Sequence, residues 1–231
     1  MTDYLLVHGG AHGAWCWERL IPYLRRDQRV RKVVAVDLIG HGVRVSEKDQ
    51  DQITVEDYIQ DLIKAIQDGN MQDVVLVGHS LAGTLIPHAA IRVPNRLKRL
   101  VFLSAIIPPE GQNGLETLKK LGQPEFAPEA MEENFRRMFC NDLDETSARW
   151  LLSSLGPEPA AGLVTPVTRK GFPRTIPITY IVLTKDQALL PEWQREVLRN
   201  LDNPEVVELD SGHDAMISCP KELAGMLLKY A

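Results

Sequence analysis

The most informative part of this chain is the run Val74-Val75-Leu76-Val77-Gly78-His79-Ser80-Leu81-Ala82-Gly83. Its apolar residues are typical of a buried strand, the small residues after them predict a turn, and the segment Leu81–Val93 predicts a helix that stops before Pro94. A serine on a sharp strand-to-helix turn projects its hydroxyl away from the backbone, as a nucleophile requires. Ala82 stands where the G-x-S-x-G pattern has a second glycine, and we expect its methyl group to be tolerated. The run therefore predicts that Ser80 is a nucleophile.

The segments on both sides of this run alternate short apolar stretches with helical periodicity. Thr54, for example, can cap a helix whose apolar stripe recurs from Val55 to Ile66. Because most of the short stretches are apolar throughout, they predict strands of a parallel sheet that helices cover on both faces. Ligands of such α/β folds bind at the carboxyl ends of the strands. The six expected strands are Tyr4–Val7, Val33–Val36, Val74–Val77, Leu100–Leu103, Ile178–Leu183 and Val206–Leu209.

Residues 108–175 interrupt this alternation, since they contain no convincing strand. A structureless loop of this length would be unusual in a compact domain. We therefore expect a core formed by residues 1–107 and 176–231, with residues 108–175 inserted after the fourth strand as a helical cap over the strand ends. The helix-like pieces of this insertion are Leu115–Leu121, Pro128–Phe139 and Glu145–Leu155.

A serine hydroxyl is a weak nucleophile unless a neighbouring base removes its proton. The chain has six histidines, and His213 is the one that follows the last expected strand, where this kind of site carries its base. Asp186, on the loop after the fifth strand, is the expected acid that orients His213. Asp210 and Asp214 are closer in sequence, but residues so near on an extended loop point away from the histidine ring.

Ester hydrolysis also needs hydrogen-bond donors for the oxyanion that develops during attack. The expected donors are the backbone N–H groups of Leu81, directly after the nucleophile, and of Gly10, in the loop after the first strand, with Ala11 as the alternative to Gly10. The expected substrate walls combine residues of that loop with apolar residues of the cap: Gly9, Ala11, Trp15, Phe126, Phe135, Met138, Phe139, Trp150 and Leu151, together with Leu81.

The composition excludes several function classes. With 26 Lys and Arg against 31 Asp and Glu, the net charge of −5 argues against non-specific nucleic-acid binding. No apolar run approaches the length of a membrane helix, and the first residues lack the basic start of a signal peptide, so we expect a cytoplasmic protein. The three cysteines, Cys16, Cys140 and Cys219, have neither metal nor redox spacing.

Four motifs in chain order resemble the hydroxynitrile lyase and plant methyl-ester esterase group of the α/β-hydrolases. They are Leu6–Trp17, Gly78–Leu81, Tyr180–Asp186 and Gly212-His213. The resemblance runs nearly from end to end and implies a six-stranded, mostly parallel core with a helical cap, no cofactor, no metal and often a homodimer. It places the catalytic triad on Ser80, Asp186 and His213, and the oxyanion hole on the amides of Gly10 and Leu81.

Two positions favour ester hydrolysis over the other chemistry of this group. Hydroxynitrile lyases carry Thr or Asn at the position of Gly9, and one branch carries Lys at the position of Asp214. Glycine has no side chain to hold a cyanohydrin hydroxyl, and an acidic residue would repel cyanide. We therefore expect a serine esterase for small apolar carboxylic esters. Carbamates, lactones and thioesters would use the same groups, and the alternatives are a hydroxynitrile lyase and a low-turnover small-molecule receptor.

Overall fold

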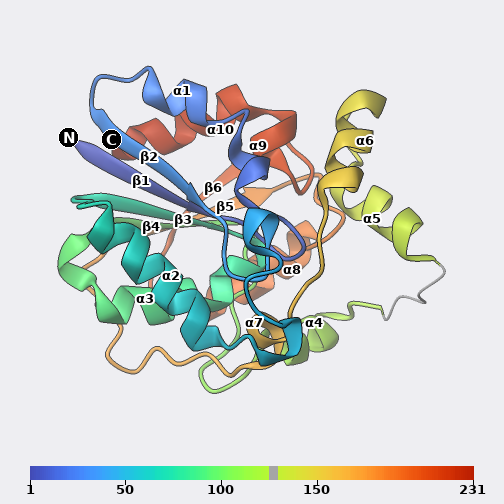
Figure 1. Cartoon of the computed structure of the whole chain (residues 1–231), viewed down its shortest axis with the longest axis horizontal. Helices are drawn as coiled ribbons and strands as arrows, with labels where there is room; N and C mark the ends of the chain where they lie inside the picture. The colour runs from blue at the N-terminus through green and yellow to red at the C-terminus, as the bar shows by residue number, and fades with distance from the viewer. Residues whose placement is uncertain (125–129) are drawn as a thin grey trace.

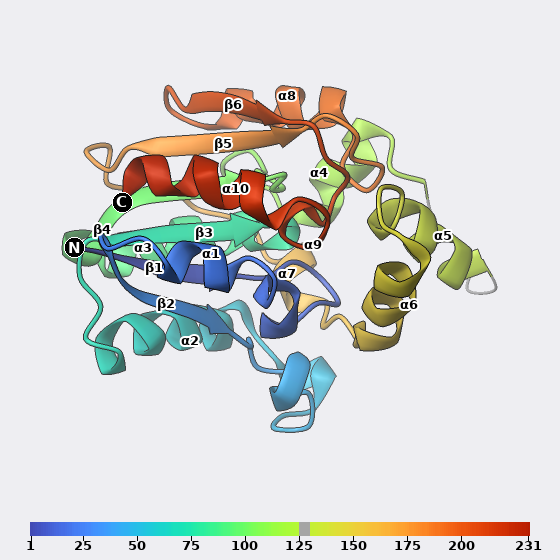
Figure 2. The same ribbon diagram turned by 90° about the horizontal axis from the view of Figure 1, so that it is seen from above.

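The computed structural model describes residues 1–124 and 130–231 and contains a six-stranded sheet. The strands lie in the order β2-β1-β3-β4-β5-β6, and all five neighbouring pairs are parallel, so the predicted fold class is confirmed (Figure 2). The central strands β1 and β3 are buried along their whole length, which explains the apolar runs Tyr4–Val7 and Val74–Val77 within them. The strands are β1 Thr2–Val7, β2 Val30–Val36, β3 Val74–His79, β4 Leu97–Leu103, β5 Ile178–Leu183 and β6 Glu205–Leu209.

Helices cover both faces of the sheet. In Figure 1, α2 (Val55–Asp68) and α3 (Ile86–Arg92) lie on one face, and α1 (Ile21–Arg25) and α10 (Pro220–Leu227) lie on the other. Each face buries its own apolar cluster, the first around Leu62 and Phe102 and the second around Trp17 and Leu103. The carboxyl-terminal part adds α8 (Pro191–Val197) and α9 (Ala215–Ser218). Within the described ranges, we find no helix with the length and apolar character that a membrane span needs.

The longest core helix, α2, follows directly from its sequence. Thr54 accepts the backbone N–H of Asp57, and the Asp57 side chain accepts the backbone N–H of Thr54, so the first turn is capped from both sides. The stripe from Val55 to Ile66 is buried against the sheet, where each large side chain contributes about 1.5–3 kcal/mol.

The chain between β4 and β5, residues 104–177, is called the insert below. Its helices lie beyond the carboxyl ends of the strands, with α5 and α6 farthest from the sheet, and its last residues return past α3 to the amino end of β5 (Figures 1 and 2). Its described residues contain helices and no strand, as the sequence predicts. The helices are α4 Gly114–Leu121, α5 Met131–Phe139, α6 Glu145–Ser154 and α7 Ala161–Val164.

The helix after Ser80 differs from the expected continuous helix over residues 81–93. The chain first forms a short 3₁₀ helix, Ser80–Thr84, and then restarts as α3. Pro87 explains the break, because it has no N–H to donate and its ring would clash with the carbonyl group of Gly83 in a continuous α-helix. The same residue is well placed in the first turn of α3.

Candidate active site

Ser80 lies at the turn between β3 and the 3₁₀ helix, with φ of 51°. This left-handed conformation costs a non-glycine residue roughly 1–2 kcal/mol, so the surroundings must hold it. The carbonyl group of Ser80 accepts the N–H of Ile106 at 2.9 Å. Gly83 makes this approach feasible, because a side chain there would overlap the carbonyl group of Ile106. The turn is therefore fixed by the loop that follows β4.

Ala82, the departure from the G-x-S-x-G pattern, is accommodated by Gly78. A Cβ atom on Gly78 would lie 3.2 Å from the Cβ of Ala82 and would overlap Ile86. The missing side chain at residue 78 therefore provides the space that the methyl group of Ala82 and the side chain of Ile86 occupy.

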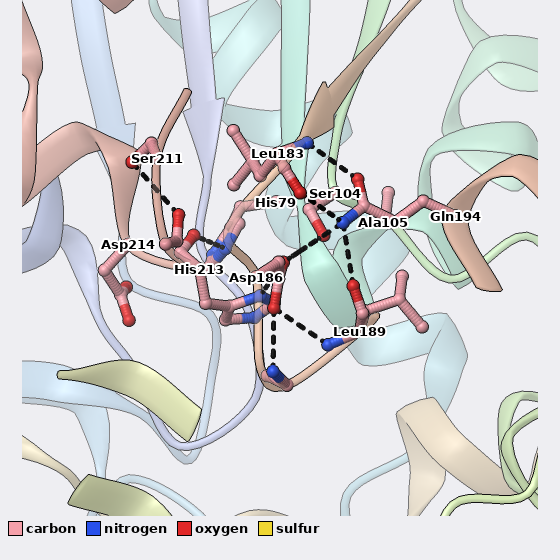
Figure 3. A network of polar contacts seen from close by, with 12 residues as sticks. His79, Ser104, Ala105, Leu183, Asp186, Leu189, Gln194, Ser211, His213 and Asp214 are labelled. Carbon is pink, nitrogen blue, oxygen red and sulfur yellow. Dashed lines mark hydrogen bonds and ion pairs between the residues drawn. The ribbon is translucent and has the colours of Figure 1, made fainter. Parts of the chain in front are cut away.

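Asp186 and His213 form a buried pair, with 2.7 Å between Asp186 Oδ2 and His213 Nδ1 (Figure 3). The other donors to this carboxylate orient it towards the histidine ring, because they occupy its remaining acceptor sites. They are Ser104 Oγ at 2.6 Å, the N–H groups of Ala188 and Leu189 at 2.7 and 2.9 Å, and Gln194 Nε2 at 3.4 Å.

The surroundings of His213 favour its charged form. Burial opposes the charge, but the charge and hydrogen bond of Asp186 together with the charge of Asp214 raise the pKa of His213 above its ordinary value. The ring of Phe139 stacks on His213 at 5.6 Å, and His79 lies at 4.5 Å and contacts the His213 carbonyl oxygen through Nε2. Burial and the nearby His213 keep the pKa of His79 well below its ordinary value, so His79 stays neutral.

The other two aspartates near His213 in sequence have different partners. Asp210 is exposed and contacts Lys185 Nζ at 2.8 Å and Thr184 Oγ1 at 3.0 Å. Asp214 is buried, with 3.0 Å between its Oδ1 and His12 Nε2. Asp214 does not belong to the described cavity lining, so it would not repel cyanide by direct contact, as the sequence suggested. Its negative charge acts instead on His213, whose pKa it raises.

Ser80 and His213 line one cavity of about 200 Å³ under the insert. Five of the expected wall residues, Ala11, Leu81, Phe135, Met138 and Phe139, also line it. The remaining described lining residues are Gly10, Ile106, Leu118, Gln123, Glu158, Leu163, Ala188 and Leu189.

The other expected wall residues lie elsewhere or outside the described ranges. Gly9 packs against Ser80, where a Cβ atom would lie 2.8 Å from the Cβ of Ser80. Trp15 and Trp150 pack edge to face at 5.3 Å and are absent from the described lining of the cavity, and Leu151 is fully buried in the core. Phe126 lies outside the described residues.

The alternative oxyanion donor, Ala11, already has a partner, since its N–H donates to Glu158 Oε2 at 2.6 Å. Gly10 and Leu81 both line the cavity. Leu81 is the second residue of a helical turn, so its N–H has no acceptor within that helix. The geometry thus favours Gly10 over Ala11 as the partner of Leu81.

The residues that sequence reasoning missed include Glu158, Ser104 and Asp142. Glu158 lines the cavity, Ser104 donates to the Asp186 carboxylate, and Asp142 Oδ2 accepts the N–H of Gly212 at 2.6 Å. Only Ser104 carried a signal, because it follows a strand at the catalytic edge of the sheet. Within the described ranges, no group of three or more His, Cys, Asp or Glu side chains could hold a metal ion.

Residues 4–226 of the chain match the alpha/beta hydrolase family. The chain belongs to that family. Methylesterase 9 of Arabidopsis thaliana is 30% identical over 255 residues, which cover 100% of this chain and 98% of the relative. The carbendazim hydrolyzing esterase of Nocardioides sp. is 26% identical and is covered to 98%, as is this chain. The family predicted from the four motifs of this α/β-hydrolase is therefore confirmed.

Solved structures agree with this assignment. An extracellular alpha/beta-hydrolase from a Paenibacillus species superposes with a TM-score of 0.85 at 25% identity, covering 100% of this chain and 99% of that one. It is described as sharing structural and functional homology with tobacco Salicylic Acid Binding Protein 2. The tomato Methylketone Synthase I superposes with a TM-score of 0.79, also at 25% identity, over 99% of this α/β-hydrolase and 96% of that chain.

Proposed function

We propose that this protein is a serine esterase that cleaves small, neutral, apolar carboxylic esters. The observation that carries the proposal is that Ser80 and His213 line one apolar cavity and that His213 is paired with the buried carboxylate of Asp186. The names of the relatives, which are methylesterases and other esterases, support the same reaction class.

In the proposed reaction, His213 takes the hydroxyl proton of Ser80 while the serine oxygen attacks the ester carbonyl carbon. The N–H groups of Gly10 and Leu81 stabilise the oxyanion of the tetrahedral intermediate. His213 then gives its proton to the leaving alcohol, and an acyl group remains on Ser80. Water, deprotonated by His213, then attacks that acyl group, and the bond to Ser80 breaks as His213 returns the proton to the serine oxygen, which releases the acid. Asp186 keeps Nδ1 of His213 protonated, so that its other nitrogen can carry the transferred proton.

The cavity wall indicates the chemistry of the substrate. Its described lining is mostly apolar and contains no Lys or Arg, while Glu158 adds a carboxylate. An ester with a second, negatively charged group would meet no cation there and would be repelled by Glu158. The volume of about 200 Å³ suits a short acyl or alcohol group.

The insert supplies half of this wall. We propose that residues 108–175 act as the cap, because Leu118, Phe135, Met138, Phe139 and Leu163 line the same cavity as Ser80. The cytoplasmic location, the homodimer and the lack of a cofactor remain predictions.

The proposal is tested with a fluorophosphonate probe and a panel of 4-nitrophenyl and methyl esters. Wild type should be labelled and should turn over short neutral esters. Ser80→Ala should lose labelling and about 10⁴–10⁶-fold of kcat, as in other nucleophile deletions. Ser153→Ala, which changes an exposed serine of α6, is the matched control and should leave activity unchanged.

The two alternative functions have their own signatures in this experiment. Rapid cleavage of mandelonitrile with poor ester turnover would favour the lyase. Tight binding of an ester without turnover or labelling would favour a receptor.

A further inference from the structure

The loop after β1 adopts an unusual backbone conformation at Ala11. Its φ is 59°, in the left-handed region that costs a residue with a Cβ atom roughly 1–2 kcal/mol. Both backbone polar groups of Ala11 are bound by one segment of the insert. The N–H of Ala11 donates to Glu158 Oε2 at 2.6 Å, and its carbonyl group accepts the N–H of Gly156 at 2.8 Å. The insert thus holds Ala11 in this conformation from both sides.

This clamp acts on the peptide next to the expected oxyanion donor. The peptide between Gly10 and Ala11 is fixed at its N–H by Glu158 and at its carbonyl group by His12 Nδ1, at 2.7 Å. The preceding peptide, which carries the N–H of Gly10, is fixed at its carbonyl group by His8 Nδ1 at 2.8 Å. Gly10 has no side chain to restrict its two soft torsions, so its N–H direction depends on these neighbouring peptides.

The carboxylate of Glu158 also lies close to the backbone of Gly10, the expected oxyanion donor. A Cβ atom on Gly10 would lie 3.0 Å from Glu158 Oε2. A free carboxylate here would oppose the developing oxyanion, but His41 Nε2 lies 3.0 Å from the same oxygen and is almost fully buried. His41 in turn contacts the carbonyl oxygen of Ile39 through Nδ1 at 3.3 Å. Oε2 of Glu158 is therefore shared between the imidazole of His41 and the N–H of Ala11.

We propose that Glu158 is a positioning residue of the oxyanion hole. By holding Ala11 in its left-handed conformation, it keeps the N–H of Gly10 directed at the site where the oxyanion forms. This inference rests on the proposed esterase function and adds a residue that the sequence motifs do not include. Because the oxyanion exists only in the transition state and the intermediate, Glu158 should act on kcat and leave KM nearly unchanged.

The test compares Glu158→Ala and Glu158→Gln with the control Glu110→Ala. Glu110 is a matched control because it also accepts a backbone N–H of the insert, that of Arg169 at 2.7 Å, but is absent from the described cavity lining. The measurements are kcat and KM for 4-nitrophenyl butyrate and the inhibition constants of a trifluoromethyl ketone and the corresponding methyl ketone. The trifluoromethyl ketone forms a tetrahedral adduct that uses the oxyanion hole.

Glu158→Ala should lower kcat about 10- to 100-fold, which does not exceed the effect of removing one oxyanion donor completely. KM should change less than about twofold. It should weaken the trifluoromethyl ketone by a similar factor and leave the methyl ketone unaffected. Glu158→Gln should recover most of the loss, since its amide oxygen can accept the N–H of Ala11. Glu110→Ala should behave as wild type. If Glu158→Ala does not fold, Glu158→Asp should still show the kcat loss, because the shorter side chain cannot reach Ala11.

Three results would overturn the positioning role. One is an unchanged kcat in both Glu158→Ala and Glu158→Asp, and another is a loss confined to KM. The third is a Glu158→Gln variant as impaired as Glu158→Ala, which would mean that the charge matters rather than the hydrogen bond. An inactive, unlabelled wild type would instead reject the esterase function together with this inference, so the two failures are distinguishable.

Discussion

The carboxylate of Asp142 accepts the backbone N–H of Gly212, the residue before His213, at 2.6 Å. Next to it, Asn141 Nδ2 donates to the carbonyl group of Lys185, the residue before Asp186, at 2.8 Å. Gly212 permits this contact, since a side chain there would overlap both Asn141 and Asp142. One corner of the insert after α5 therefore holds the two loops that carry Asp186 and His213.

Asp142→Ala should loosen the loop before His213. We expect kcat/KM to fall about tenfold and stability to fall by about 1–3 kcal/mol, because the N–H of Gly212 loses its partner. The control is Asp144→Ala, which removes the N-terminal cap of α6 and should lower the melting temperature without affecting kcat/KM. Equal losses of activity in the two variants would contradict a specific role of Asp142.

Asp186→Asn should reduce kcat about 10⁴-fold, because the amide favours the wrong tautomer of His213. Asp210→Asn, which changes an exposed aspartate paired with Lys185, should leave kcat within about twofold. Steady-state kinetics of the two purified variants decide between them. A larger loss in Asp210→Asn would show that the acid is assigned to the wrong loop.

The pH profile should follow the raised pKa of His213. The base must be neutral, so kcat/KM should fall as pH decreases through a midpoint above the ordinary histidine value of about 6.5. Asp214→Asn should move this midpoint to lower pH, since a negative charge that favours the imidazolium is removed. Asp210→Asn provides the control profile. An acid limb that does not move in a folded Asp214→Asn protein would exclude electrostatic coupling between Asp214 and His213.

Gly9→Ala should impair catalysis by displacing the nucleophile. The new Cβ atom would lie 2.8 Å from the Cβ of Ser80, closer than such atoms approach in proteins, so we expect at least a tenfold loss of kcat. Gly225→Ala in α10 has no atom within 4 Å of the new Cβ and should leave activity unchanged while slightly raising the melting temperature. Labelling rates with the fluorophosphonate probe measure the nucleophile directly. Equal labelling of both variants would show that residue 9 has room for a side chain.

The parts of the molecule that could be predicted are those with a local physical cause. The strands were recognisable because burial on both faces demands uninterrupted apolar residues, and the turn at Ser80 because only small residues fit around it. The break in the helix after Ser80 was missed, although a proline at position 87 indicates that a helix cannot run continuously through it. The paired tryptophans Trp15 and Trp150 were misplaced because an aromatic residue of the insert can pack against another aromatic as readily as line a cavity.

Contacts between distant segments could not be predicted from one sequence. Glu158 is 147 residues from Ala11 along the chain, and Asp142 is 70 residues from Gly212. The sequence around Glu158 or Asp142 does not distinguish either residue from an acidic residue exposed to solvent. Only the folding of the insert brings them to Ala11 and Gly212. By contrast, the approach of Asp186 to His213 follows from their positions after adjacent parallel strands, β5 and β6.

The hydrogen bonds from the insert to residues 11, 185 and 212 also limit how this enzyme can be rebuilt. Exchanging caps between α/β-hydrolases is an obvious route to new substrate preferences, since the cap supplies much of the cavity wall. In this protein such a chimera would lose more than selectivity, because the exchanged piece also supports the loops that carry Gly10, Asp186 and His213. A functional graft would therefore have to carry over Asn141, Asp142, Gly156 and Glu158, even though the first three do not belong to the described cavity lining. The insert thus shapes the cavity and also supports these loops, so a change of substrate preference would have to preserve its hydrogen bonds to them.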